Sequence, residues 1–214
     1  MVLPKPRPSY MTEEYLKLER LSDERHEYID GEVYAMAGES LAHSRICVDL
    51  ALTLGNQLKQ KPCEVLSPNM KVRSGPPIKQ QKSKKGMFSY ADVSVVCGEP
   101  LFHDEFQDVL LNPTVIIEVL SPSTESFDRG EKFHRYRTWV DSLTDYVVVS
   151  QSLPAVDHFG RQPDGKWLLT PVFGLEGSIY LASINCHLHL GEIYGRVTFA
   201  DAEPEQETAE FQTL

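Results

Sequence analysis

Hydrophobic side chains recur at helical spacing near the start of the chain and again around residue 50. Between Ser40 and Gln60 this recurrence predicts a long helix, with Ser40 as its N-cap and Pro62 as its stop. A shorter helix is predicted from Thr12, as its N-cap, to about Glu19. Between the two helices, the run RHEYIDGEVYAMAG alternates apolar and polar residues around Asp30-Gly31.

An Asp-Gly pair between two alternating runs is typical of a β-hairpin with a two-residue type I′ turn. In such a hairpin Glu27 and Glu32 lie on the same face. After the long helix, CEVLSPNMKVRS and MFSYADVSVVCG are both rich in strand-forming residues. Each of these two runs is therefore expected to contribute β-structure.

The segments TVIIEVL and DYVVVSQS are continuous apolar runs, which is typical of strands buried on both faces. Between them a helical pattern covers Asp128 to Val140, with Asp128 and Glu131 in capping-box spacing. The last part of the chain predicts a hairpin with an Asp164-Gly165 turn in HFGRQPDGKWLLT, and one late strand in SIYLASINCHLHL. This order predicts an α/β fold with a mixed central β-sheet flanked by helices.

The chain has 214 residues, of which 41% are hydrophobic, and this is enough for one domain with a substantial core. We expect an extended arm over residues 1–10, a single domain over 11–200 and an acidic tail over 201–214. The longest nearly uncharged stretch, Val109 to Ile117, is far shorter than the roughly 20 residues of a membrane span. The N-terminus lacks the apolar core of a secretory signal, which predicts a cytoplasmic protein with no membrane segment.

The four cysteines lie far apart, and none forms a CxxC pair. This spacing predicts reduced thiols and argues against a zinc ribbon. The formal net charge of -10 argues against non-specific coating of nucleic acid, although half of this charge comes from the acidic tail. A lysine-rich loop, with Lys79, Lys82, Lys84 and Lys85, breaks the acidic average and could attract a duplex, although such loops are usually only solvated.

Two carboxylates occupy unusual positions within apolar strand-like runs. Glu118 lies in the middle of TVIIEVL, and Asp92 lies between Tyr90 and Val93. An ionised carboxylate without a partner is costly to bury, by several kcal/mol or more. Either each acid is solvated at a strand end or paired with an arginine such as Arg129 or Arg135, or the two acids share a divalent cation. Mg²⁺ is commonly held by one or two carboxylates together with substrate phosphate.

The two runs that contain these acids carry a family resemblance. SYADVSVVCG followed by NPTVIIEVLSPSTESFDRGEKFHRYR resembles the PD-(D/E)XK restriction-endonuclease-like superfamily, specifically its large bacterial branch of predicted restriction endonucleases that is common in cyanobacteria. The opening TEEYLKLERLSDERHEYIDGEVYAMAG is similar to the same branch, so that the resemblance covers about residues 11–150. It implies a restriction-endonuclease-like core.

The resemblance also implies roles for individual residues. Asp92 and Glu118 match the two acids that bind metal in the superfamily. Ala91 stands in place of the motif's proline, and Leu120 stands in place of its lysine. In DRGEK, Lys132 matches a lysine that has moved to the following helix. The alternative is that Lys132 only pairs with Asp128, four residues earlier, on a helix surface.

The remaining candidate site residues have fewer supporting features in the sequence. The superfamily often adds an acid from an N-terminal element, which Glu27 or Glu32 could supply, although solvated hairpin glutamates are common. His43 could contact phosphate or water, but histidines on helix surfaces are more often bystanders. Arg135 could contact a backbone phosphate. His187 and His189 share a strand face without a third ligand at zinc spacing.

The combined expectation is a Mg²⁺-dependent endonuclease, with Mn²⁺ as a substitute metal, that hydrolyses phosphodiester bonds in DNA. The superfamily resemblance also implies a homodimer, because restriction-type nucleases commonly pair to cut both strands. Two alternatives stay open. One is a binding or assembly module that keeps the fold without the chemistry, since Leu120 removes the usual lysine. The other is a metal-dependent hydrolase of a smaller phosphodiester.

Overall fold

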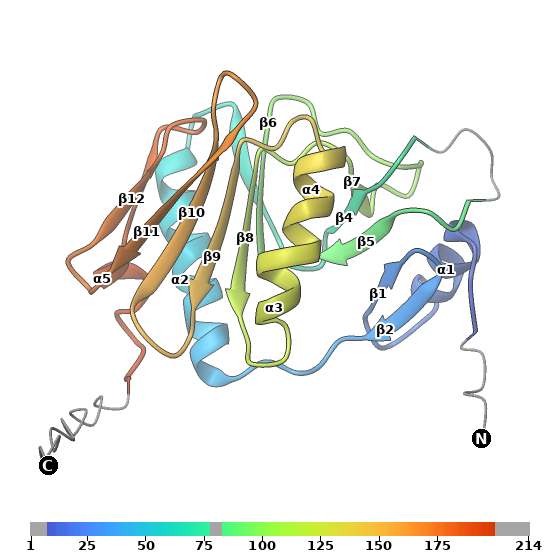
Figure 1. Cartoon of the computed structure of the whole chain (residues 1–214), viewed down its shortest axis with the longest axis horizontal. Helices are drawn as coiled ribbons and strands as arrows, with labels where there is room; N and C mark the ends of the chain where they lie inside the picture. The colour runs from blue at the N-terminus through green and yellow to red at the C-terminus, as the bar shows by residue number, and fades with distance from the viewer. Residues whose placement is uncertain (1–7, 78–82, 200–214) are drawn as a thin grey trace, which may run out of the picture.

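The computed structural model describes residues 8–77 and 83–199 (Figure 1). The acidic tail, most of the N-terminal arm and the loop lysines Lys79 and Lys82 lie outside the described residues. The chain opens with helix α1 (Thr12–Glu19) and a hairpin of β1 (His26–Ile29) and β2 (Glu32–Ala35). Asp30 and Gly31 have φ angles of 48° and 106°, which are the positive values that a type I′ turn requires. The predicted first helix and hairpin are both confirmed. The prediction that Thr12 caps the helix is wrong, because Thr12 already lies in its first turn and Met11 holds the N-cap position.

Helix α2 (Leu41–Leu58) begins and ends close to the predicted bounds. The Ser40 hydroxyl accepts a hydrogen bond of 3.1 Å from the backbone N–H of His43, which satisfies one of the free N–H groups of the first turn. This cap fixes the start of the helix and therefore the direction in which His43 projects.

A six-stranded sheet forms the centre of the molecule (Figure 1). Its strands, in spatial order, are β11 (Trp167–Phe173), β10 (Ala155–Arg161), β9 (Asp145–Ser150), β8 (Val115–Leu120), β6 (Val93–Cys97) and β3 (Cys63–Leu66). β8 and β9 are parallel and the other neighbours are antiparallel, so the predicted mixed central sheet is confirmed.

A second sheet contains the N-terminal hairpin. Its order is β2, β1, β5 (Met87–Tyr90), β4 (Lys71–Ser74) and β7 (Val109–Leu110). Each of the two long strand-like runs predicted from the sequence forms two strands, one in each sheet. The first run gives β3 in the central sheet and β4 in the second sheet, and the second run gives β5 in the second sheet and β6 in the central sheet. The chain passes from one sheet to the other at Ala91 and Asp92.

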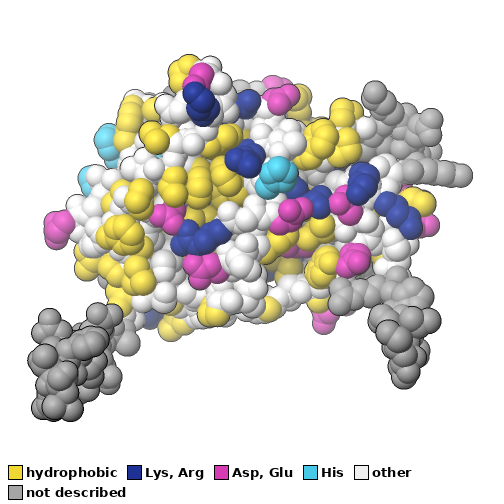
Figure 2. Space-filling model, in the orientation of Figure 1, with side chains coloured by type: hydrophobic (Ala, Val, Ile, Leu, Met, Phe, Trp, Pro, Cys, Tyr) yellow, Lys and Arg dark blue, Asp and Glu magenta, His cyan; other side chains and the backbone are white. Residues whose placement is uncertain are grey.

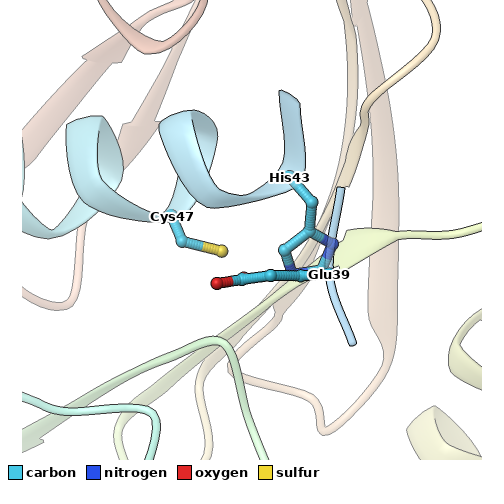
Figure 3. Close-up of side chains that lie close together, drawn as sticks. All are labelled: Glu39, His43 and Cys47. Carbon is cyan, nitrogen blue, oxygen red and sulfur yellow. The ribbon is translucent and has the colours of Figure 1, made fainter. Parts of the chain in front are cut away.

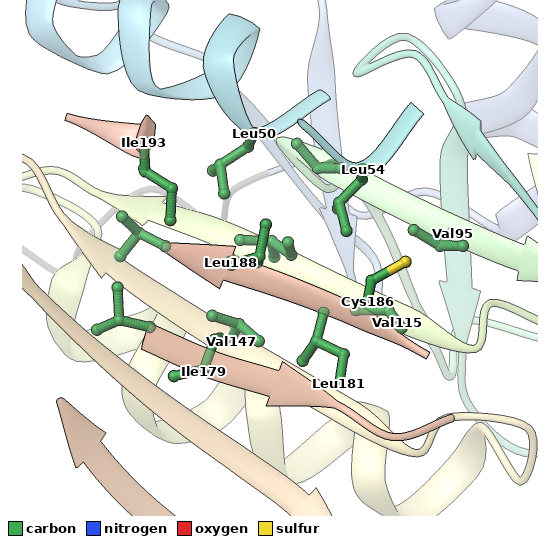
Figure 4. Close-up of a cluster of buried hydrophobic side chains, with 14 of the residues drawn as sticks. Leu50, Leu54, Val95, Val115, Val147, Ile179, Leu181, Cys186, Leu188 and Ile193 are labelled. Atoms are coloured by element: carbon green, nitrogen blue, oxygen red, sulfur yellow. The ribbon is translucent and has the colours of Figure 1, made fainter. Parts of the chain in front are cut away.

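Helices cover both faces of the central sheet. On one face, Leu50 and Leu54 of α2 pack over Val95, Val115 and Val147 of the sheet (Figure 4). The same core includes side chains from β12 (Ser178–Leu181), β13 (Cys186–His189) and the short helix α5 (Leu190–Ile193). The single late strand predicted for this region is thus wrong, because the chain turns back near Asn185, which has a φ of 50°, and forms a hairpin.

The helix on the other face starts earlier than predicted. It comprises α3 (Glu125–Phe127), a π-helical turn η1 (Asp128–Lys132) and α4 (Phe133–Trp139). The prediction that Asp128 caps the helix is wrong, because one turn precedes it and its side chain faces inward. The π turn holds one extra residue, a local widening that is frequent at functional sites.

The expectation of reduced thiols is wrong for one pair of cysteines. Cys63 on β3 and Cys97 on β6 lie opposite each other in the antiparallel ladder and form a disulfide across 34 residues of sequence. Cys47 and Cys186 are free. Within the described ranges, no helix combines the length and hydrophobicity needed to cross a membrane.

Candidate active site

Asp92 and Glu118 lie beside each other on neighbouring antiparallel strands. Asp92 directly precedes β6, whose ladder with β8 pairs Val93 with Ile117. One further step along the ladder brings Asp92 opposite Glu118. Asp92 Oδ2 also accepts a hydrogen bond of 2.7 Å from the backbone N–H of Val119. The passage of the chain between the two sheets therefore positions Asp92 against the strand that carries the second acid.

Glu118 points toward the face of the sheet that α4 covers. Its neighbours on this face, Ile116 and Leu120, belong to the apolar cluster under that helix, and Glu118 itself is only 3% exposed. Its Oε1 forms an ion pair with Lys132 and no further hydrogen bond among the described residues. Burial raises the pKa of the Glu118 carboxyl well above its usual range, against the attraction of Lys132. This carboxylate needs more positive charge than its surroundings supply.

Lys132 reaches Glu118 from the π turn. Its Nζ lies 3.0 Å from Glu118 Oε1, 3.4 Å from Glu27 Oε1 and 3.5 Å from Asp128 Oδ1. Burial works against the ammonium group, but the carboxylates of Glu118 and Glu27 raise the pKa of Lys132. The surface pairing proposed as an alternative is wrong, because Lys132 is 4% exposed and Asp128 is only one of its three acidic neighbours.

Leu120 explains why the lysine comes from a helix. The side chain at position 120 shares the face of Glu118, as the strand period requires, but it is packed in the apolar cluster with Phe133 and Tyr136. Lys132 approaches the same carboxylate from the layer above. The ammonium group is thereby placed beside Glu118 although the strand position holds a leucine.

The N-terminal hairpin contributes one acid to this cluster. Glu27 contacts Lys132, and its Oε1 accepts a hydrogen bond of 3.3 Å from the backbone N–H of Tyr90. Glu32 lies on the same hairpin face, as the register predicts, but next to the turn, where its carboxylate accepts a hydrogen bond from the Tyr34 hydroxyl. Of the two candidate glutamates, the structure brings Glu27 to the lysine.

His43 joins the site from α2, on the side of Asp92. Its Nε2 lies 3.0 Å from Asp92 Oδ1 and 3.7 Å from Glu39 Oε2. Burial disfavours the charged ring, but the hydrogen bond and charge of Asp92 raise the pKa of His43 above its usual value. His43 is therefore a direct neighbour of the candidate acid.

The arginines considered as partners of the two acids are engaged elsewhere. Arg129 pairs with Glu125 and Asp157. Arg135 bonds Glu131 at 2.7 Å and Asp30 at 2.9 Å, which ties the helix to the hairpin turn. Pairing with Arg129 or Arg135 therefore does not account for the buried carboxylates.

The donor set suits a hard divalent cation. Four carboxylates, those of Glu27, Asp92, Glu118 and Asp128, surround one lysine and one histidine. Oxygen ligands and excess negative charge are what Mg²⁺ prefers, and Glu118 Oε1 has Lys132 as its ion-pair partner and no further hydrogen bond among the described residues. Asp92 and Glu118 are the pair that could hold such an ion.

Sequence reasoning assigned Asp128 to a helix cap or a surface pair and missed its inward position. Its main-chain oxygen accepts a hydrogen bond of 2.8 Å from the buried Tyr146 hydroxyl, which holds the π turn against the sheet. The four-residue spacing to Lys132 was visible in the sequence. The burial of both side chains was not.

Comparisons with known proteins agree with this architecture. A family model described as "Uma2: Putative restriction endonuclease" matches residues 12–189. Two uncharacterized proteins of Synechocystis sp., slr1290 and sll1609, are each 34% identical to the chain. The first alignment spans 194 residues, or 91% of this chain and 96% of slr1290, and the second spans 166 residues, or 78% of this chain and 89% of sll1609.

A solved structure has the same fold. The crystal structure of a protein from Anabaena variabilis, described as a putative nuclease belonging to DUF820, matches with a TM-score of 0.68. It covers 87% of this chain and 98% of its own, at 16% sequence identity. The arrangement of mixed sheets and helices is therefore shared by the two proteins.

Proposed function

The chain belongs to the Uma2 family of restriction-endonuclease-like proteins, and from this premise we propose that it is a Mg²⁺-dependent endonuclease that hydrolyses phosphodiester bonds in DNA. One observation carries the proposal: Lys132 Nζ lies 3.0 Å from Glu118, which neighbours Asp92 on the next strand. Two acids and one lysine on separate elements provide the groups that metal-assisted hydrolysis requires.

In the proposed mechanism, Asp92 and Glu118 would hold the cation. When bound, Mg²⁺ would supply Lewis-acid stabilisation of the scissile phosphate and would lower the pKa of an attacking water. Lys132 donates hydrogen bonds to the nucleophile or to the phosphate oxygens as negative charge develops on them. Glu27 and Asp128 keep the Lys132 ammonium group charged and oriented. His43 orients Asp92 through its hydrogen bond of 3.0 Å.

On the face in Figure 2, lysine and arginine side chains are interspersed with acidic ones and are not gathered into one basic surface. Lys85 Nζ lies 3.6 Å from Asp30 Oδ2 in the turn of the hairpin that also carries Glu27. The Lys85 side chain is 73% exposed. We infer that local charges near this hairpin, rather than the net charge of the protein, attract the phosphate backbone.

Plasmid nicking in the presence of Mg²⁺ or Mn²⁺ tests the proposal. We expect wild-type protein to nick or linearise supercoiled DNA, and the variants Asp92→Asn, Glu118→Gln and Lys132→Met each to lose at least about 100-fold in rate, because each removes a charge that acts on the transition state. Chelation of the metal with EDTA should abolish cleavage.

Matched surface substitutions control for unrelated effects. Asp164 and Lys166 form an exposed ion pair on the turn between β10 and β11, so Asp164→Asn and Lys166→Met should cleave like wild type. Cleavage by none of the proteins, or equal cleavage by all of them, would favour the module that keeps the fold without the chemistry. Hydrolysis restricted to small phosphodiesters in a substrate panel would contradict the DNA substrate.

A further inference from the structure

A second group of potential metal ligands lies at the start of α2. His43 and Cys47 lie one turn apart on the same side of the helix, and Glu39, which precedes the N-cap Ser40, brings its carboxylate beside them (Figure 3). One ligand atom from each residue, a carboxylate oxygen, a ring nitrogen and the sulfur, lies within 4.8 Å of the other two. These atoms are close enough for small side-chain rotations to bring them around one ion.

The ligand types differ from those of the proposed Mg²⁺ site. Mg²⁺ takes oxygen ligands, whereas a thiolate and an imidazole select a softer cation such as Zn²⁺. Zn²⁺ is bound by Cys, His and Glu side chains, and three protein ligands with a fourth position open to water are a known zinc geometry. The ligand chemistry therefore separates the two sites although they lie close together.

The surroundings of these three residues are also suited to a cation. Asp92 Oδ1 lies 3.0 Å from His43 Nε2, and burial, followed by the charges of Asp92 and Glu39, raises the pKa of the Cys47 thiol. Glu39 is 55% exposed, so an ion can enter from solvent, while His43 is largely covered. A neutral thiol among these carboxylates gains from a divalent ion, which neutralises the thiolate that binding creates.

We propose that Glu39, His43 and Cys47 form a binding site for Zn²⁺ or a similar thiophilic divalent cation. Binding exchanges the Cys47 S–H bond for a metal–sulfur bond, and the proton passes to solvent. His43 Nε2 is the ring nitrogen that faces both Glu39 and Asp92, so it is the ligand atom expected on the histidine, and a bound ion would take the place of its hydrogen bond to Asp92. This proposal does not depend on nuclease activity.

Cobalt spectroscopy of the full-length protein tests the site without any substrate. Titration with Co²⁺ should produce a near-ultraviolet charge-transfer band from a thiolate ligand, together with the visible absorption of a tetrahedral ion, and Zn²⁺ should abolish both. Cys47→Ser should lose the charge-transfer band. Glu39→Gln and His43→Gln should weaken Co²⁺ binding by at least about tenfold.

Three controls identify the source of the signal. Cys186→Ser removes the buried free thiol and should keep the band, as should a variant with Cys63 and Cys97 both changed to serine. Glu118→Gln should also keep it, because Glu118 belongs to the proposed Mg²⁺ site. No band at saturating Co²⁺ would overturn the proposal, as would a band that persists in Cys47→Ser or disappears in Glu118→Gln. Circular dichroism of each variant confirms that it is folded.

Discussion

At the scale of single residues, the site depends on a balance between buried charges. Glu118 and Lys132 are each almost fully buried and lie 3.0 Å apart. Removing one partner of such a pair leaves the other without compensation, whereas neutralising both together is far less costly. The two side chains should therefore be coupled in stability as well as in activity.

We predict that Lys132→Met lowers the free energy of unfolding by about 3 kcal/mol, because Glu118 then stays buried without its main cation. The double variant Glu118→Gln with Lys132→Met should lose at least about 1 kcal/mol less than the two single losses added together. Urea denaturation of the four proteins measures this coupling. Additive losses would contradict it, and Lys166→Met serves as the exposed control.

At the scale of elements, the site is assembled from separate helices and strands that ion pairs hold together. Arg20 at the end of α1 bonds Asp108, which directly precedes β7, and Lys71 of β4 lies 3.0 Å from the same carboxylate. Arg135 fastens the helix after β8 to the N-terminal hairpin through Asp30. These ion pairs hold the sheet that carries Glu27, while the disulfide between β3 and β6 closes an edge of the central sheet.

The Asp108 network predicts a pH-dependent contribution to stability. Burial disfavours the charged carboxylate, but hydrogen bonds from Arg20 and Lys71 lower the pKa of Asp108 to about 2. Because the folded pKa is depressed, the stabilisation is complete above the unfolded pKa of about 3.9 and is lost as the pH falls toward 2. Asp108→Asn should cost up to about 2 kcal/mol at pH 7 and almost nothing at pH 2.

Denaturant unfolding of both proteins across this pH range provides the measurement. A loss that is the same at pH 7 and pH 2 would mean that the ionised carboxylate is not the source of the stabilisation. Asp164→Asn removes an acid from an exposed ion pair and supplies the comparison.

The disulfide between Cys63 and Cys97 predicts a dependence of stability on reductant. Reduction releases a constraint across 34 residues, which should lower the free energy of unfolding by about 2–4 kcal/mol. Unfolding curves with and without dithiothreitol measure the change. Cys97→Ser should show no such response, whereas Cys186→Ser should respond like wild type.

At the scale of the whole molecule, the proposed active site of one protomer would act on one DNA strand at a time. Cleavage of both strands by a single protomer would require it to release and rebind, whereas two copies related by a twofold axis can act on both strands. The edge strand β11 exposes Leu168, Leu169 and Phe173, with Phe173 67% exposed. An exposed apolar edge of this kind is a ready surface for another chain.

We therefore predict a homodimer, which sedimentation velocity of the full-length protein can test at micromolar concentration. The dimer should linearise plasmid rather than accumulate only nicked circles. A single species with the mass of one chain would contradict this prediction, and Phe173→Glu should shift the equilibrium toward monomer if β11 forms the interface.

The sequence by itself determined the order and type of most elements, because hydrophobic period, caps and turn residues act over a few neighbouring positions. The long helix capped by Ser40, the Asp30-Gly31 hairpin and the buried strand around Glu118 all follow from such local signals. The two acids were identifiable because an isolated carboxylate in an apolar run has a desolvation cost that demands a partner.

Only the tertiary structure decided which distant groups meet. The division of strand-like runs between two sheets, the inward turn of Asp128 and the pairing of Cys63 with Cys97 depend on contacts across tens of residues. The choice of Glu27 rather than Glu32 as the neighbour of Lys132 arises in the same way. Such contacts depend on how whole faces pack together, and packing is a property of the assembled layers that no local pattern specifies.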